Sequence, residues 1–160
     1  KWLEIGVDVM GFGDDLGTQT ATMMSPRHFS KHLKPGYTKM FEVCRAADTH
    51  VRLHTDGHVL EIVDDLIACG VTVLNPQVRC NTIEGIESTC KGKVCVDLDL
   101  DRQGFPFWTP KEIKAHIYEA VEVLGSPEGG LMLYAECEPD VPLENIEAIC
   151  EAFEKVRQSL

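Results

Sequence analysis

Five short apolar runs, each ending in polar residues and followed by a helical pattern, constrain the fold more than any other feature of this chain. The runs occupy residues 5–12, 51–55, 71–75, 94–100 and 131–136. Strands that alternate with helices in this way are typical of βα units on a parallel sheet. The sequence therefore predicts an α/β fold with about five parallel strands, in a single domain over residues 1–160.

Apolar and polar side chains alternate within several of these runs. In the fourth run, Val96 and Leu98 alternate with Asp97 and Asp99. Successive side chains of a strand point to opposite faces, so one face suits covering helices and the other is acidic. A doubly wound sheet would bury apolar side chains on both faces. The pattern therefore favours part of a barrel, with polar groups at the mouth where the strands end.

Helix boundaries carry recognisable capping signals. Ser25 followed by Pro26 predicts a helix start, and the pair Pro35-Gly36 is expected to break that helix. Residues 109–112 (TPKE) predict a capping box for a helix that ends at Gly125. Further helices are expected over residues 37–47, 58–69, 82–89 and from Pro142 onward.

Composition excludes several classes of partner. The net charge of -11 disfavours binding to nucleic acid or to an anionic membrane, since both require local positive charge. No apolar run approaches the roughly 20 residues that span a bilayer. The seven cysteines lack CxxC pairs, which is typical of reduced thiols in a cytoplasmic protein. A start at Lys1, without methionine, suggests a piece of a longer gene product.

The sharpest cluster of chemical groups is the sequence HTDGH at residues 54–58. His54 and Asp56 share one strand face, so the two could bind a metal ion together. Alternatively, His54 acts as an acid or base that Asp56 orients. In a purely structural interpretation, Asp56 and Gly57 form a turn.

Acidic residues on the same predicted face form a second group. Asp97, Asp99 and Glu136 could bind cationic substrate groups or transfer protons from carboxyls with raised pKa values. The alternative is ion pairing with Arg52 or Arg102. We predict that these side chains converge with His54 and Asp56 on one polar basin.

Loop residues near the strand ends are candidates for substrate contacts. Asp14, Asp15 and Gln19 follow the first run, and Asn75 and Gln77 close the third. Arg52, in the second run, is a further candidate, as a cation for the acid groups of a substrate. Carboxylates and amides at these positions suit hydrogen bonds to a polar ligand, although they are equally able to stabilise turns.

Several stretches, taken in order, resemble the C-terminal part of the uroporphyrinogen decarboxylase superfamily. That superfamily includes the zinc-dependent methylcobamide:coenzyme M methyltransferases. The resemblance rests on residues 14–19 (DDLGTQ), 25–35, 53–57 (LHTDG), 70–76, 101–103 (DRQ), 109–112 and 142–146. It implies a (β/α)8 barrel whose fourth to eighth strands are present here, without the N-terminal arginine and aspartate that the decarboxylases use on their substrate.

The chain departs from both branches of that superfamily. Glu136 is the nearest match to a histidine that the decarboxylases place after the last strand. The methyltransferases have His-x-Cys where this chain has His54-x-Asp56, and Cys137 is in loose register with their later cysteine. The resemblance therefore implies zinc as a possible cofactor, held by His54, Asp56 and Cys137.

Three hypotheses about function follow. The first is a uroporphyrinogen decarboxylase-like lyase of porphyrin biosynthesis, acting on a tetrapyrrole or related acid, of which this chain is an inactive C-terminal segment. The second is a methyltransferase that uses a corrinoid substrate. The third is a non-catalytic half-barrel that pairs with itself, because open sheet edges favour association. We expect self-association of the chain to homo-oligomers in each case.

Overall fold

The computed structural model describes residues 1–159 and contains one sheet of five parallel strands in the order β1-β2-β3-β4-β5. The strands are β1 (Val9–Asp14), β2 (His50–Thr55), β3 (Val73–Pro76), β4 (Cys95–Asp99) and β5 (Leu131–Tyr134). The helices are α1 (Trp2–Ile5), α2 (Pro26–His28), a π-helical turn (Phe29–Leu33), α3 (Lys34–Ala46), a 3-10 turn (Leu60–Ile62), α4 (Val63–Cys69), α5 (Val78–Asn81), α6 (Ile83–Cys90), α7 (Pro110–Leu124) and α8 (Leu143–Ser159).

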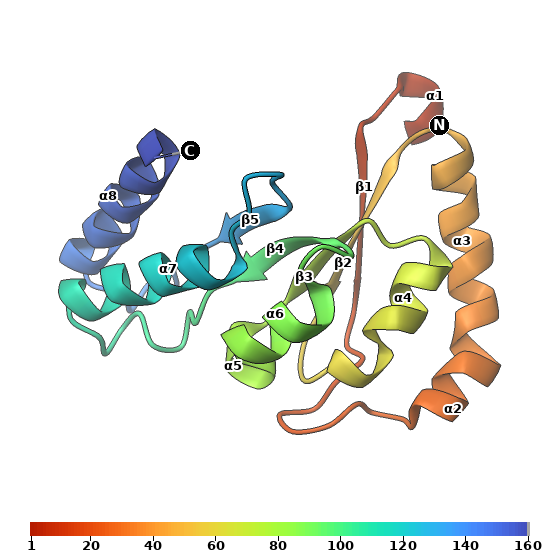
Figure 1. The fold of residues 1–160 in the computed structure, drawn as a ribbon, viewed down its shortest axis with the longest axis horizontal. Coiled ribbons are helices and arrows are strands. Elements are labelled where there is room, and N and C mark those ends of the chain that lie inside the picture. The colour runs from red at the N-terminus through yellow and green to blue at the C-terminus, as the bar shows by residue number, and fades with distance from the viewer. Residues whose placement is uncertain (160) are drawn as a thin grey trace.

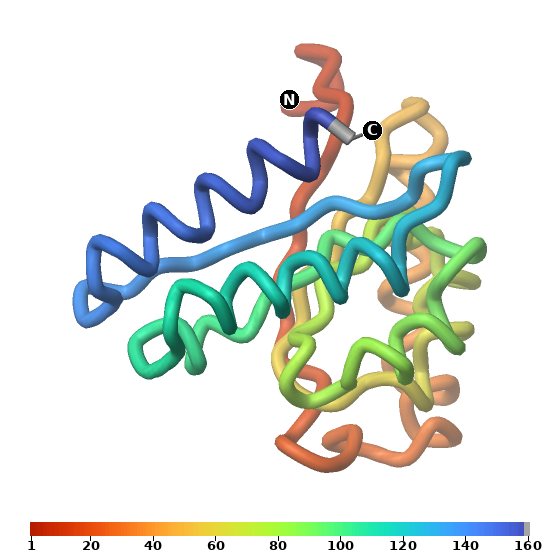
Figure 2. Tube along the Cα trace, turned by 60° about the vertical axis from the view of Figure 1, so that its left-hand side comes forward, coloured from red at the N-terminus to blue at the C-terminus, as the bar shows by residue number. Residues whose placement is uncertain are grey.

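This architecture confirms the predicted α/β fold and is consistent with part of a (β/α)8 barrel. Neighbouring strands in the sheet are also consecutive in the sequence, and each pair is parallel. Figure 1 shows the helices following the sheet in chain order, from α3 at one end to α8 at the other. In Figure 2, α7 and α8 run alongside one another, and the two helices are in contact. The sheet is open, with β1 and β5 at its edges.

The helices cover one face of the sheet. In β2, Val51 and Leu53 are fully buried in the hydrophobic core, while Arg52 and His54, which alternate with them, are only partly buried. In β5, Tyr134 is exposed on the same face as Arg52, with their side chains in contact. The alternation predicted from the sequence therefore divides a packed face from a more open polar face. No helix among residues 1–159 is long and apolar enough to cross a membrane.

The first predicted strand is wrong at its N-terminal end. Residues Trp2–Ile5 form a short helix, which ends at Gly6 in a left-handed conformation with φ of 84°. The strand then begins at Val9 and continues to Asp14, beyond the predicted end at residue 12. An apolar run alone does not distinguish a strand from a short helix, so the glycine was the more informative signal.

The pair Pro35-Gly36 does not break the second helical segment. Ser25 caps α2 as predicted, and its side chain accepts a hydrogen bond from the backbone of His28. The chain then continues through the π-helical turn into α3, where Pro35 lies in the first turn. A proline is tolerated there because the first-turn N–H groups of a helix have no acceptor within it.

Other boundaries shift by a few residues. The helix predicted over residues 58–69 begins as the 3-10 turn Leu60–Ile62, and Gly70 ends it with φ of 111°. The capping box at Thr109 and Glu112 is confirmed at the start of α7. The short helix α5 was not predicted, because its four residues show too little periodicity to be recognised.

Two glycines cross in direct contact beside the end of β2. A Cβ atom on Gly57 would lie 2.2 Å from the carbonyl carbon of Gly17, and Gly57 has φ of +82°. The contact lets the loop after β1 reach the turn after β2, where Gly17 N–H donates to the carbonyl of Asp56 at 3.1 Å. His58 N–H likewise donates to the carbonyl of Thr18 at 2.7 Å. The crossing therefore places the backbone of Asp56.

We predict that Gly57→Ala destabilises the fold by roughly 3 kcal/mol, through backbone overlap and the strain of a positive φ. Gly13→Ala is the matched control, because its Cβ would meet no heavy atom within 4 Å, and we expect a change within about 0.5 kcal/mol. Urea denaturation of both variants measures the difference. Equal stability of the two variants would contradict the close backbone contact between Gly57 and Gly17.

Candidate active site at the carboxyl ends of the strands

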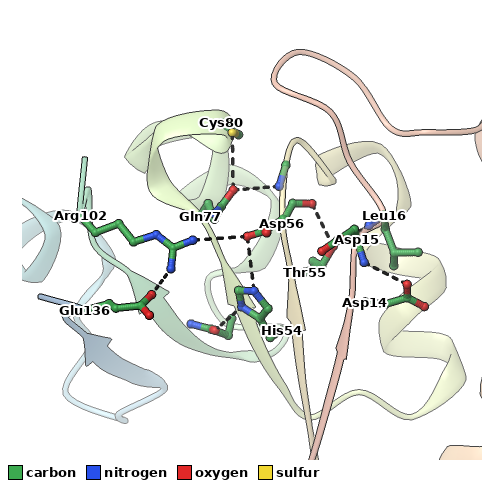
Figure 3. A network of polar contacts seen from close by, with 12 residues as sticks. Asp14, Asp15, Leu16, His54, Thr55, Asp56, Gln77, Cys80, Arg102 and Glu136 are labelled. Carbon is green, nitrogen blue, oxygen red and sulfur yellow. Dashed lines mark hydrogen bonds and ion pairs between the residues drawn. The ribbon is translucent and has the colours of Figure 1, made fainter. Parts of the chain in front are cut away.

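Polar side chains from β2, β3 and β4, and from the loops after β2, β4 and β5, form one connected network on the open face of the sheet. Figure 3 shows the part of it formed by His54, Asp56, Arg102 and Glu136. The network extends from the middle of the sheet to the loops that follow the strands, where ligands bind in parallel α/β folds. The structure brings together these predicted site residues: Arg52, His54, Asp56, Asn75, Asp97, Asp99 and Glu136.

One contact of the network is an ion pair between β2 and β4, which reaches across β3. Arg52 on β2 donates to Asp97 Oδ2 on β4 from both Nε, at 2.7 Å, and Nη2, at 2.6 Å. Its guanidinium carbon also lies 6.0 Å from the centre of the Tyr134 ring. Asp97 is 7% exposed, so its charge requires this partner. Arg52, predicted as a substrate-binding cation, thus forms the ion pair that was the alternative interpretation of the sequence.

Hydrogen bonds determine the orientation of the His54 ring. Asn75 Nδ2 donates to the backbone carbonyl of Asp97 at 2.5 Å, and a carbonyl can only accept. The Asn75 side-chain oxygen must then face His54, where it accepts from Nδ1 at 2.7 Å. His54 therefore carries a proton on Nδ1 and presents Nε2 to the end of the strand.

Asp56 lies between an imidazole and a guanidinium. Its Oδ1 atom is 3.4 Å from His54 Nε2 and 3.9 Å from Arg102 Nη2. The other end of the Arg102 fork pairs with Glu136, so one arginine joins the ends of β2 and β5 (Figure 3). In the sequence, Arg102 belonged to the DRQ motif of the family resemblance and was an expected ion-pair partner of the acids, but its position in a loop gave no signal of which acids it would meet. In the tertiary structure, Arg102 lies between Asp56 and Glu136 at the carboxyl ends of the strands.

Asp99 is the most unusual acid of the network. Its side chain is 1% exposed, and Oδ1 accepts no hydrogen bond from any residue in the part of the chain described. Burial raises the pKa of the Asp99 carboxyl above its usual range. The nearby Arg102 and His54 counteract part of this increase, while Asp56 and Asp97 add to it. Asp99 is thus a carboxyl that retains its proton more readily than an exposed aspartate.

Amide side chains hold the turn that follows Asp56. Gln77 Oε1 accepts from Gly57 N–H at 2.9 Å, which gives this predicted substrate-binding residue a structural contact. Asn81, 1% exposed, donates to the Gly57 carbonyl and accepts from Val59 N–H, each at 2.9 Å. Sequence reasoning missed Asn81 because a lone amide in an unrecognised helix has no distinguishing pattern.

Asp14, at the end of β1, and Asp15 and Gln19, in the loop after it, contribute no side chain to the ion pairs of Asp56, Arg102 and Glu136. Asp14 accepts a hydrogen bond from the Tyr37 hydroxyl on α3, on the helix-covered side. Asp15 donates its backbone N–H to Asp14 Oδ1 at 2.9 Å. Gln19 lies nearer the mouth, where its Oε1 accepts from the Cys80 thiol at 3.6 Å. Burial and the Asp14 contact raise the pKa of Tyr37, so this phenol remains a donor.

The residues suggested as zinc ligands do not fit a zinc site in this structure. His54 and Asp56 are neighbours, but Arg102 already places a positive charge beside Asp56. Cys137 is exposed, and in the described part of the chain it does not group with His54 and Asp56 as a third ligand. Among residues 1–159, no three His, Cys, Asp or Glu side chains group as a metal site would need.

Comparison with known proteins identifies the family. The family model described as uroporphyrinogen decarboxylase (URO-D) matches residues 1–156. The chain belongs to the URO-D family. A methyltransferase from Methanosarcina mazei has a similar structure, with a TM-score of 0.66 and 26% sequence identity. A search of curated proteins found no match.

The similarity to the methyltransferase covers 97% of this URO-D family chain but only 44% of that protein. The chain therefore spans less than half the length of this structural relative. Family membership agrees with the superfamily resemblance noted in the sequence. That superfamily includes both decarboxylases and methyltransferases, so the chemistry has to be inferred from the side chains of the site.

We predict that Arg52→Met destabilises the fold by about 2 kcal/mol, because it leaves the Asp97 charge without a partner in a low-dielectric position. The double variant Arg52→Met/Asp97→Asn should recover at least half of this loss, since the amide carries no charge. Urea denaturation of the wild type, both single variants and the double variant closes the cycle. Additive effects of the two substitutions would show that the pair is not coupled.

Proposed function

We propose that the protein containing this chain is a uroporphyrinogen decarboxylase-like lyase, which removes CO2 from a carboxylated tetrapyrrole or a related acid. The observation that carries the proposal is Asp99. Its carboxyl is buried at the strand ends, has an unpartnered oxygen and a raised pKa, and lies near both Arg102 and His54. A buried acid of this kind suits the delivery of a proton to carbon.

The chemistry requires one bond to break and one to form. When the carbon–carboxylate bond breaks, CO2 leaves and its bonding electron pair stays on the substrate carbon. Asp99 in its acid form donates the proton to that carbon, and solvent then restores the proton on Asp99. Before the carbon–carboxylate bond breaks, a proton from solvent adds to the pyrrole ring and makes it cationic, so that the ring can delocalise the electron pair, and the ring returns this proton to solvent after the new C–H bond has formed. The carboxylate of Asp56, held between His54 and Arg102, stabilises the cationic ring. His54 and Arg102 thereby act in part by positioning this carboxylate.

The similar methyltransferase from Methanosarcina mazei favours a second candidate, a corrinoid-dependent methyl transfer. In that reaction zinc would lower the pKa of a thiol so that the thiolate attacks a methyl group. The poor fit of His54, Asp56 and Cys137 to zinc supports the lyase over this alternative. Because the chain spans less than half of that methyltransferase, we expect the isolated chain to show no turnover of either kind.

Metal analysis separates the two candidates. We expect less than about 0.1 zinc per chain after purification in zinc-containing medium, because the site lacks a thiolate donor set. The measurement is elemental analysis of the protein before and after dialysis against a chelator. One zinc per chain that withstands dialysis, and is lost in His54→Ala, would favour the methyltransferase.

We predict that Asp99→Asn, in the protein as its gene encodes it, lowers the rate of uroporphyrinogen decarboxylation by at least about 100-fold. In the wild type the rate should fall as pH rises through the raised pKa of Asp99, because only the acid form donates. Asp48→Asn is the control, since Asp48 is exposed and precedes β2 at the opposite end of the sheet. Unchanged turnover in Asp99→Asn would exclude Asp99 as the proton donor.

The raised pKa of Asp99 also determines how the stability of the fold should depend on pH. An acid whose folded-state pKa lies above its unfolded value favours folding at low pH, and this contribution is lost as pH rises through the folded value. Asparagine cannot ionise, so the variant Asp99→Asn does not share this loss. Its stability relative to the wild type should therefore be higher at about pH 8 than at about pH 4. Thermal unfolding at both values tests the sign. A relative loss at the higher pH would show that ionised Asp99 is stabilised in the fold.

A further inference from the structure

A small cleft opens beside Asp99, between α5 and the loop that follows β4. Its lining includes Gln77, Arg79, Cys80, Asp99, Arg102 and Gln103. The cavity holds about 20 Å³, which admits one water-sized group but no ring. A substrate ring must therefore stay over the open face of the sheet, and no more than one oxygen of a terminal group can enter the cleft.

Arg79 is the positively charged side chain of this cleft that remains available to a ligand. Arg102 also lines the cleft, but both of its terminal nitrogens already pair, with Glu136 and with Asp56. Arg79 makes its contacts through Nη1 alone, to Asp101 at 3.3 Å and to Gln103 at 3.4 Å. Within residues 1–159, no hydrogen bond from Nε or Nη2 of Arg79 is present.

The contacts of Arg79 hold the guanidinium in place without using its second edge. Asp101 has a side chain only 13% exposed and pairs with one corner of the fork, while Arg79 itself is 48% exposed. A guanidinium presents two parallel N–H groups that match the two oxygens of a carboxylate. The Nε–Nη2 edge of Arg79, a residue that lines the cleft beside Asp99, is thus available to one carboxylate.

We propose that Arg79 binds a substrate carboxylate other than the one that is lost, at a position where coproporphyrin has a methyl group, and so favours substrates that carry more acid groups. The proposal rests on the proposed function, because it uses the same site and the same class of carboxylated ring. It adds a specificity-determining residue from α5, an element that the sequence patterns did not indicate. Arg79 would hold the ring so that the reacting group lies near Asp99.

Binding of porphyrins with different numbers of carboxylates tests this assignment. The protein as its gene encodes it is titrated with uroporphyrin, which has eight carboxylates, and with coproporphyrin, which has four, and porphyrin fluorescence reports binding. The variants are Arg79→Gln and Arg79→Lys, with Arg27→Gln as the control. Arg27 is exposed on α2, so Arg27→Gln changes the net charge equally at a distant place.

We expect the wild type to bind uroporphyrin more tightly than coproporphyrin. Arg79→Gln should weaken uroporphyrin binding about tenfold and narrow this difference, because one charge-assisted pair is lost. Arg79→Lys should recover only part of the loss, since an ammonium cannot bind both oxygens in the same way, and Arg27→Gln should bind as the wild type does. Circular dichroism of each variant verifies folding.

The outcomes separate this inference from the proposed function. If the wild type binds neither porphyrin, or if Arg79→Gln binds both as the wild type does, the role of Arg79 is overturned. If Arg79→Gln loses the discrimination but the wild type does not decarboxylate uroporphyrinogen, the role of Arg79 stands and the proposed lyase activity fails. Decarboxylation with unchanged binding in Arg79→Gln would support the lyase and reject this inference.

Discussion

The parallel pairing of β2, β3 and β4 determines most of what this molecule can do. Because β2 and β3 pair with His54 opposite Asn75, and the Asn75 amide reaches the backbone of Asp97, three strands contribute to one row of polar groups. A slip of one residue in either pairing would turn those groups under the helices and bring apolar side chains to the open face. The buried alternate residues, such as Leu53 and Leu98, make such a slip costly. Core packing therefore maintains the geometry of the site.

Environment assigns different roles to acids that look equivalent in the sequence. Asp97 and Asp99 lie two residues apart on one strand face, yet Asp97 has the Arg52 guanidinium and Asp99 has an oxygen without a partner. Asp56, at the end of β2, faces both His54 and Arg102. Asp97 thus pairs with an arginine inside the sheet, Asp56 lies between an imidazole and a guanidinium at the strand ends, and Asp99 is buried with an unpartnered oxygen. This separation is the physical basis of the proposed decarboxylation.

The strands, the covering helices and the acidic face were predictable because periodicity reports burial directly. The π-helical turn before α3 and the helix α5 were not, since a proline within a helical pattern predicts a break and four residues show no period. The same limitation hid Arg79 and Asn81, which lie on α5. Asp14 was grouped with the site residues because it follows a strand, but its position in the alternation turns it toward Tyr37.

The sequence by itself determined the order of βα units, the face of each strand that is packed, and membership of a superfamily, because these depend on local patterns and motifs. It also indicated that His54, Asp56 and the acids of β4 would lie at strand ends. Only the tertiary structure decided which charges meet. Arg102 joins β2 to β5, Arg52 joins β2 to β4, and Asp99 is left without a partner, through contacts between residues distant in the chain. Such pairings depend on distances and desolvation that no local pattern encodes.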